Sequence, residues 1–195
     1  MSENMIIKPK INQVDDLLQG AVREFISTRV MNPLLPLGTY PVSLARDPRL
    51  YDWYQYTHGV HEVDDELSPL YDLCRVVLLT ALDRTDRQLH KLFKIRIVNS
   101  QPGPMDRAQP HIDMVGPHQT GLWFPAGSDG ATEVMHERSW LQEWDTPEKF
   151  TVAERLEPRD NTWYDFDGTH WRFTGRPEKF DDRYCVIFNF VAMPK

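Results

Sequence analysis

One of the seven histidines, His111, is followed two positions later by an aspartate, Asp113. On a β-strand, side chains two positions apart point to the same face, so an imidazole and a carboxylate would enter one cavity. Two imidazoles and one carboxylate hold one face of an octahedral metal such as non-haem Fe(II), and leave the opposite face open for a cosubstrate and O2. With roughly a 15% chance of an acid two residues after each histidine, about one such pair arises by accident, so a third ligand is needed.

Two histidines outside the predicted loops are candidates for that third ligand. His136 falls in a β-prone run soon after the pair, whereas His170 follows an aromatic run and an Asp-Gly turn and precedes a basic loop and a last apolar run. The other four lie in or beside predicted loops, where surface or hydrogen-bonding histidines are usual: His58, His61, His90 and His118. This sequence context favours His170 over His136 as the third ligand.

The first half of the chain has helical periodicity. Apolar residues recur at helical spacing over 14–26, with Asp15 and Asp16 near the amino end, where the helix dipole favours negative charge. A second helix is predicted over 68–82, with Ser68 in the capping position and a proline after it.

Two segments between these helices lack a helical pattern. The stretch 32–41 carries three prolines and a glycine and is predicted to be an extended connection. The run 51–56 is crowded with aromatic residues. Such a run could form a lid over a substrate or could pack the helices against the rest of the domain, and packing is the commoner role.

The second half changes from a helical to an alternating pattern. Short β-prone runs are separated by turn residues, which predicts a β-sandwich or jelly roll with the helices packed outside it. We expect a single domain over 1–195, with mostly helical support and a candidate lid in 1–90 and a jelly-roll catalytic core in 91–195. The predicted strands cover 92–98, 121–124, 132–135, 150–156, 162–166 and 184–191.

Composition narrows the class of partner. The 22 basic and 29 acidic residues give a net charge of −7, which argues against a surface built to neutralise nucleic-acid phosphates. The two cysteines, Cys74 and Cys185, are too few for a disulfide scaffold and suit a reducing compartment. No signal peptide or membrane span is expected, and these features predict a cytoplasmic protein, in a host cell if the source is viral.

Four runs in the second half resemble a known family. The run PHID at 110–113 is similar to the family's H-x-D, and TGLWF at 120–124 with SDGATE at 128–133 is similar to its next strand and D-G-G-T turn, with Ala131 in place of the second glycine. DFDGTH at 165–170 resembles F-x-G-x-x-H, and DRYCVIFNF at 182–190 resembles the closing R-x-S strand. The family is the Fe(II)/2-oxoglutarate-dependent dioxygenases, especially the small prolyl-4-hydroxylase-like members of phages and bacteria.

This resemblance implies a fold, a site and an activity. The implied fold is mainly β with α, a double-stranded β-helix, or jelly roll, with flanking N-terminal helices. The implied ligands of Fe(II) are His111, Asp113 and His170. With 2-oxoglutarate as cosubstrate and O2, such an enzyme hydroxylates its substrate and releases succinate and CO2.

The resemblance also implies the cosubstrate site. A guanidinium can bind the distal carboxylate of 2-oxoglutarate through two parallel hydrogen bonds, which is the role implied for Arg183. Cys185 shares its strand face and replaces the family's usual Ser or Thr with a weaker S–H donor. The alternative for Arg183 is a solvent-exposed charge at a strand edge.

The sequence also allows alternative functions and further candidate residues. A cupin-like metal enzyme could use the same ligands without 2-oxoglutarate, helped by His136 or His118, and a jelly-roll binding or structural protein would lack redox activity altogether. For an enzyme, a peptide or protein side chain or a small molecule is favoured over nucleic acid as substrate. Three further residues could line the cosubstrate pocket or be structural strand residues: Arg96, Asn99 and Trp123.

Overall fold

The computed structural model describes residues 7–26, 39–45, 60–62, 68–100, 102, 110–114, 116–138 and 150–195. Its elements follow in the order α1 (Asp16–Phe25), β1 (Thr39–Ala45), β2 (Val60–Glu62), α3 (Ser68–Asp83), β3 (Arg87–Ser100), β4 (Gln119–Phe124), β5 (Thr132–Arg138), β6 (Val152–Leu156), β7 (Thr162–Asp167), β8 (His170–Thr174) and β9 (Arg183–Pro194).

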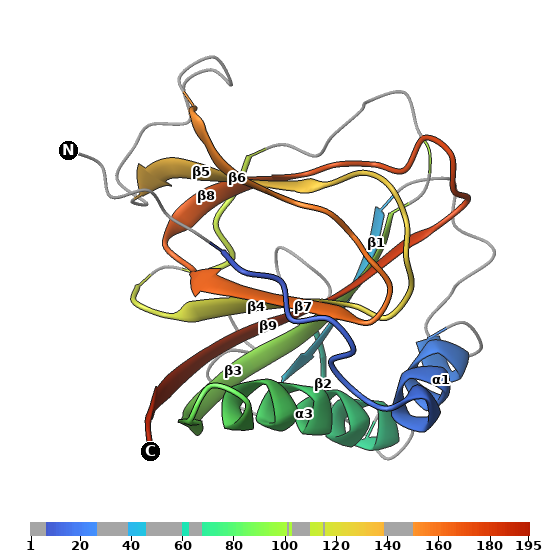
Figure 1. The fold of residues 1–195 in the computed structure, drawn as a ribbon, viewed down its shortest axis with the longest axis vertical. Helices are drawn as coiled ribbons and strands as arrows, with labels where there is room; N and C mark the ends of the chain where they lie inside the picture. The colour runs from blue at the N-terminus through green and yellow to red at the C-terminus, as the bar shows by residue number, and fades with distance from the viewer. Residues whose placement is uncertain are drawn as a thin grey trace.

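The strands form two sheets. The larger has six strands in the order β2-β1-β3-β9-β4-β7, and the smaller has three in the order β6-β5-β8. Figure 1 shows the smaller sheet over one face of the larger sheet, with α1 and α3 on the opposite side. All described strand pairs except β1–β2 are antiparallel. The predicted jelly-roll architecture with helices outside it is therefore confirmed.

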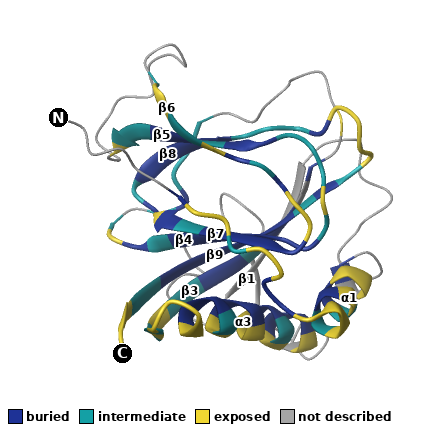
Figure 2. Cartoon of the chain, in the orientation of Figure 1, coloured by how far each residue is buried: buried dark blue, intermediate teal, exposed yellow. Residues whose placement is uncertain are grey.

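Both predicted helices are present. Helix α1 begins after Asp15, whose side chain accepts a hydrogen bond from the backbone N–H of Leu18, so the acidic start acts as an N-cap. Helix α3 packs against β3 and β9 and contacts α1. The helix faces turned towards the sheet are buried and the outer faces are exposed, as Figure 2 shows.

The larger sheet separates two apolar cores, because side chains alternate between its faces. On the helix side, the rings of Trp163 and Phe188 pack in a tilted arrangement, with centroids 5.2 Å apart, in the cluster that includes residues of α1 and α3. On the side facing the smaller sheet, a second cluster includes Leu122, Phe124 and Ile187. This second side is the interior of the jelly roll, and polar residues lie in it as well.

Three strands fall outside the sequence prediction. Part of the stretch predicted as a connection, from Thr39 to Pro41, belongs to β1, which pairs with β3. Within the described residues, the pairing of β1 with β2 begins at Ser43, so Pro41 lies where β1 is a sheet edge and a proline is tolerated. Strands β2 and β8 were not predicted either, whereas the aromatic run 51–56 lies outside the described residues.

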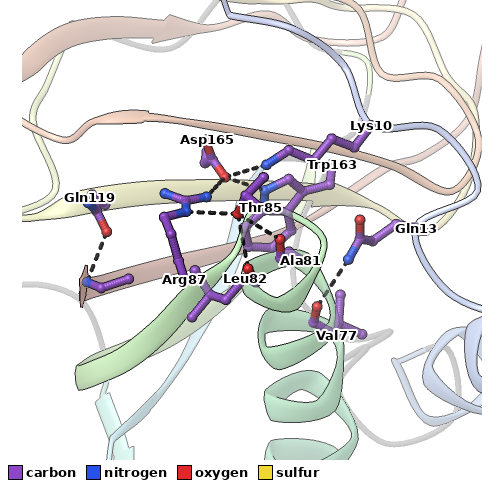
Figure 3. Close-up of polar contacts among 11 residues, drawn as sticks. Lys10, Gln13, Val77, Ala81, Leu82, Thr85, Arg87, Gln119, Trp163 and Asp165 are labelled. Carbon is purple, nitrogen blue, oxygen red and sulfur yellow. Dashed lines mark hydrogen bonds and ion pairs between the residues drawn. The ribbon is translucent and has the colours of Figure 1, made fainter. Parts of the chain in front are cut away.

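The segment before α1 is attached to strand β7 by backbone and side-chain contacts. Lys10 and Trp163 exchange two backbone hydrogen bonds of 2.9 Å. The carboxylate of Asp165 accepts from Lys10 Nζ at 2.7 Å, from Arg87 Nη2 at 2.5 Å and from Trp163 Nε1 at 2.9 Å (Figure 3). Burial raises the pKa of Asp165, but these hydrogen bonds and charges outweigh it and leave the pKa below its usual value. One carboxylate thus links the N-terminal segment, β3 and β7.

Replacing Asp165 with asparagine is expected to lower the free energy of unfolding by about 1–3 kcal/mol at pH 7, since the charge-assisted hydrogen bonds are lost. Because the folded-state pKa is depressed, the wild-type advantage exists above about pH 4 and disappears as the pH falls through the carboxyl's pKa. Urea unfolding at several pH values measures both effects. Asp167→Asn, at a neighbouring and more exposed carboxylate paired with Arg138, is the control and should cost less than about 1 kcal/mol.

Candidate metal centre

His111 and Asp113 lie beside strand β8, which carries His170. The backbone groups of His111 and Arg172 exchange two hydrogen bonds of 3.0 Å, which adds the segment around His111 to the free side of β8 as an antiparallel partner. With this register, Asp113 comes level with His170. Two segments that are far apart in sequence therefore bring the three predicted ligands to the same part of the smaller sheet.

Asp113 is buried among cations. Its Oδ1 lies 2.6 Å from Arg172 Nη2 and 3.7 Å from Arg96 Nη1, and its backbone oxygen accepts from Lys94 Nζ at 3.3 Å. Burial alone raises the pKa of Asp113, but the charges of Arg172, Lys94, His111 and Arg96 hold it far below its usual value. The group is therefore a carboxylate at neutral pH, as a metal ligand must be.

Asn189 and Lys94 complete the surroundings of this carboxylate. Asn189 Nδ2 donates to Asp113 Oδ2 at 3.1 Å and lies 3.2 Å from Thr120 Oγ1, which fixes the orientation of the carboxylate from β9. Lys94 is opposite Asn189 on β3. Burial lowers the pKa of Lys94 to about 8, although the negative charge of Asp113 opposes that effect.

The His170 ring is in the tautomer with the proton on Nδ1, which leaves Nε2 able to bind a metal. Its Nδ1 lies 2.7 Å from the carbonyl oxygen of Met135, and a carbonyl can only accept, so Nδ1 donates and the neutral ring keeps a lone pair on Nε2. Nε2 is buried and has no hydrogen-bond partner within the described part of the chain. Burial lowers the pKa of His170, which favours the neutral ring.

These donors fit Fe(II) by type, but their arrangement does not close around an ion. Among the described residues, no three His, Cys, Asp or Glu side chains lie close enough together to hold a metal. His111 Nε2 is 4.0 Å from Asp113 Oδ1, and the guanidinium of Arg172 contacts both: Nη2 pairs with the carboxylate, and Nε is 3.5 Å from His111 Nε2. A guanidinium therefore takes the position between two of the predicted ligands.

Arg183 lies inside the jelly roll and is only 1% exposed, which excludes a solvent-exposed strand edge. Its Nε donates to the Gly130 carbonyl at 2.6 Å, its Nη2 donates to Thr132 Oγ1 at 2.7 Å, and its guanidinium lies 5.0 Å from the centre of the Phe124 ring. Its Nη1 is buried without a partner in the described chain. One side of the guanidinium is thus fixed, and one buried donor can bind a ligand oxygen.

Cys185 shares the interior face with Arg183, as predicted, and is also buried. The pKa of its thiol is raised to about 11, mainly by burial. The charges of Arg183 and Arg172 lower this pKa, and the charge of Asp113 raises it. Asn189, which contacts Asp113, lies at an even spacing from Arg183 and Cys185 on β9, so all three side chains are on one face of the strand. Arg183 and Asp113 therefore face the same interior.

His118 is one of the histidines that were expected in or beside loops. It is buried, its Nδ1 donates to the Gly116 carbonyl at 2.9 Å, and its Nε2 has no partner in the described chain. A Cβ atom at Gly168 would collide with this imidazole and with the Thr120 hydroxyl, which explains the glycine in the DFDGTH run. Of the two roles expected for it, surface or hydrogen-bonding, His118 has the hydrogen-bonding one.

Sequence reasoning missed several polar residues of the interior: Lys94, Arg172 and Asn189. Each lies at an even spacing from a residue that was considered, and strand alternation puts such residues on one face. Of the open candidates, Arg96 faces Asp113, whereas Trp123 packs in the helix-side core and donates to Asn161 Oδ1. The side chain of Asn99 lies outside the described part of the structure.

Comparisons with known proteins give a likeness in fold. No protein-family model and no curated protein sequence matches the chain. A prolyl hydroxylase from Trichoplax adhaerens, solved with a peptide of hypoxia inducible factor, is 12% identical with a TM-score of 0.53, over 94% of this chain and 83% of that one. The non-haem α-ketoglutarate-dependent epimerase SnoN of nogalamycin biosynthesis is 13% identical with a TM-score of 0.54, over 96% and 77%.

A third solved structure, the Fe(II)/α-ketoglutarate-dependent dioxygenase TqaL, is 14% identical with a TM-score of 0.50, over 93% of this chain and 76% of that one. The chain thus has the jelly-roll fold of the Fe(II)/2-oxoglutarate-dependent oxygenases. The prolyl hydroxylases are among the proteins that share it. No described helix has both the length and the apolar character needed to cross a membrane.

Proposed function

We propose that this chain is an Fe(II)- and 2-oxoglutarate-dependent dioxygenase that hydroxylates its substrate. The observation that carries the proposal is the buried guanidinium of Arg183, whose Nη1 has no partner in the described chain. The same interior contains Asp113 and His170, and the partly exposed His111 lies beside Asp113. A buried cationic donor without an acceptor is costly, and a carboxylate ligand would remove that cost. The shared fold supports the same function.

Each part of the interior has a role in this proposal. Fe(II) held by His111, Asp113 and His170 would supply, with 2-oxoglutarate and O2, the oxidising chemistry that yields succinate and CO2. Arg183 binds the distal carboxylate of 2-oxoglutarate, beside Cys185. The Met135 carbonyl keeps His170 in the tautomer with Nε2 unprotonated.

The apolar interior around these groups limits the access of water. Leu122, Val98 and Ile187 are buried on the face that carries Arg183 and Cys185. Such walls lower the local dielectric and strengthen the hold of Arg183 on a carboxylate. They also protect an oxidising centre from stray hydrogen donors.

The substrate class in this proposal is a peptide or protein side chain or a small molecule, rather than nucleic acid. The net charge of −7 disfavours phosphate backbones. Among the proteins with this fold, one is solved with a peptide of hypoxia inducible factor and another belongs to nogalamycin biosynthesis.

The direct test is an anaerobic titration of the purified protein with Fe(II) and then with 2-oxoglutarate. We expect iron binding, followed by the visible charge-transfer band of an iron-chelated keto acid. Bound iron without the band would favour a cupin-like metal enzyme that does not use 2-oxoglutarate. No iron binding at all would favour a non-catalytic jelly-roll protein.

A further inference from the structure

We propose that the guanidinium of Arg172 competes with the metal for Asp113 and His111, so that a divalent cation binds only when the Arg172–Asp113 ion pair opens. This inference rests on the proposed function and concerns a residue for which the proposed mechanism has no role. It makes Arg172 a determinant of metal affinity.

The first argument is geometric. Arg172 Nη2 lies 2.6 Å from Asp113 Oδ1, and the two side chains are 2% and 1% exposed. Arg172 Nε lies 3.5 Å from His111 Nε2, the nitrogen that keeps its lone pair as it accepts from the guanidinium. One cationic group therefore contacts the same oxygen and the same nitrogen that a metal ion would use.

The backbone keeps these groups together. The pairing of His111 with Arg172 of β8 through two 3.0 Å hydrogen bonds is an isolated antiparallel bridge, and it places the two residues directly opposite each other. His170 lies two positions before Arg172 on β8, so both side chains enter the same interior. Arg172 cannot leave the site without a change of rotamer, since its Cα position is fixed by the strand pair.

The second argument is electrostatic. A dication and a guanidinium that share one carboxylate inside a low-dielectric interior repel each other strongly. Lys94 and Arg96 already lie near Asp113, and the charge of Arg172 contributes to lowering the pKa of Arg183. Adding two positive charges therefore requires Arg172 to move away from Asp113.

In its present position, the guanidinium of Arg172 does not make all of its hydrogen bonds within the described part of the chain. Arg172 Nη1 is buried and has no partner in the described chain, so the present position leaves one donor unsatisfied. An anion that enters with the metal, such as the dianionic cosubstrate, could accept from this donor. Opening the ion pair thus exchanges an internal salt bridge for contacts with the incoming groups.

The competing explanation is that Arg172 orients Asp113 for the metal. The two explanations predict opposite changes in metal affinity when Arg172 is replaced. If Arg172 only positions the carboxylate, removing it weakens metal binding, as loss of outer-shell partners usually does. If Arg172 competes, removing its charge strengthens metal binding.

The test is isothermal titration calorimetry with Mn(II) on the wild type, Arg172→Gln and Arg172→Met. We expect both variants to bind Mn(II) roughly 10- to 100-fold more tightly than the wild type, the range that corresponds to one buried charge-assisted hydrogen bond. Using a polar and an apolar replacement guards against one variant failing to fold, which circular dichroism checks. Arg155→Gln is the matched control, because Arg155 is an exposed arginine of the same sheet paired with Glu133 and Glu157.

Unchanged or weaker Mn(II) binding in the folded variants would overturn the role of Arg172. In that case a charge-transfer band in the wild type would leave the proposed function intact. If neither the wild type nor the variants bind metal, both proposals fail. Adding Asp113→Asn to Arg172→Gln should remove the gain, and a gain that survives would place the metal elsewhere and reject the inference.

Discussion

Replacing His170 with alanine is expected to abolish iron-dependent consumption of 2-oxoglutarate. The ring is held by the Met135 carbonyl with Nε2 buried, so alanine removes a fixed, buried imidazole that is the proposed ligand. Loss of an outer-shell partner of a ligand already costs about 10- to 100-fold in metal affinity or activity, so loss of the ligand itself should cost at least about 100-fold. Succinate formation with and without added iron measures the effect.

His136→Ala is the matched control for this prediction. His136 was the alternative third ligand, and it lies on β5, where its backbone N–H donates to the Thr151 carbonyl. We expect the variant to keep its activity within about twofold, because His136 is not one of the three proposed ligands and the Met135 carbonyl that holds His170 belongs to the backbone. An active His170→Ala together with an inactive His136→Ala would reverse the assignment.

The second large effect is expected at Arg183. Replacing it with glutamine should raise the 2-oxoglutarate concentration needed for half-maximal turnover roughly 10- to 100-fold, because a charge-assisted, desolvated contact with a carboxylate is lost. Iron affinity should not change, since Arg183 contacts Gly130, Thr132 and Phe124 and none of the proposed ligands. Steady-state kinetics over 2-oxoglutarate concentration, with metal affinity measured in parallel, separates these effects.

Arg183 also stabilises the fold, so its variant needs its own control. Thr132→Val removes one of its two internal acceptors and leaves the guanidinium charge in place. We expect this change to lower thermal stability with only a small effect on 2-oxoglutarate use. If Arg183→Gln lowers stability to the same extent and leaves the 2-oxoglutarate requirement unchanged, the arginine is structural and the cosubstrate site is wrongly assigned.

Periodicity was sufficient to predict most of the fold. Helices over 14–26 and 68–82 correspond to α1 and α3, and the alternating runs of the second half correspond to six of its strands. Strand β8 was missed because Arg172 and the residues after Thr174 read as a basic loop, whereas the structure buries Arg172 against Asp113. A propensity argument cannot show that a charged side chain has a partner in another strand.

The candidate site was predictable only in part. The spacing of Arg183 and Cys185 indicated a shared strand face, and this face is in the interior of the jelly roll. His111 and Asp113 were expected on a strand, but they lie outside the named strands, and His111 forms a single bridge to Arg172 of β8. The contacts of Asp113 with Arg172 and Lys94 could not be anticipated, because they join residues 59 and 19 positions apart. Alternation along a strand predicts which side chains share a face of a sheet, but the contacts between residues of different sheets depend on how the sheets pack together.

The attachment of Lys10 to Trp163 has a further consequence for how copies of the protein behave towards each other. Strand β7 ends the order of the larger sheet, and an uncovered edge strand offers its backbone groups to a strand of another chain. At Trp163 both backbone groups are already paired with Lys10, which also brings a charge to this edge. The N-terminal segment therefore blocks edge-to-edge pairing of β7 with another chain at Trp163.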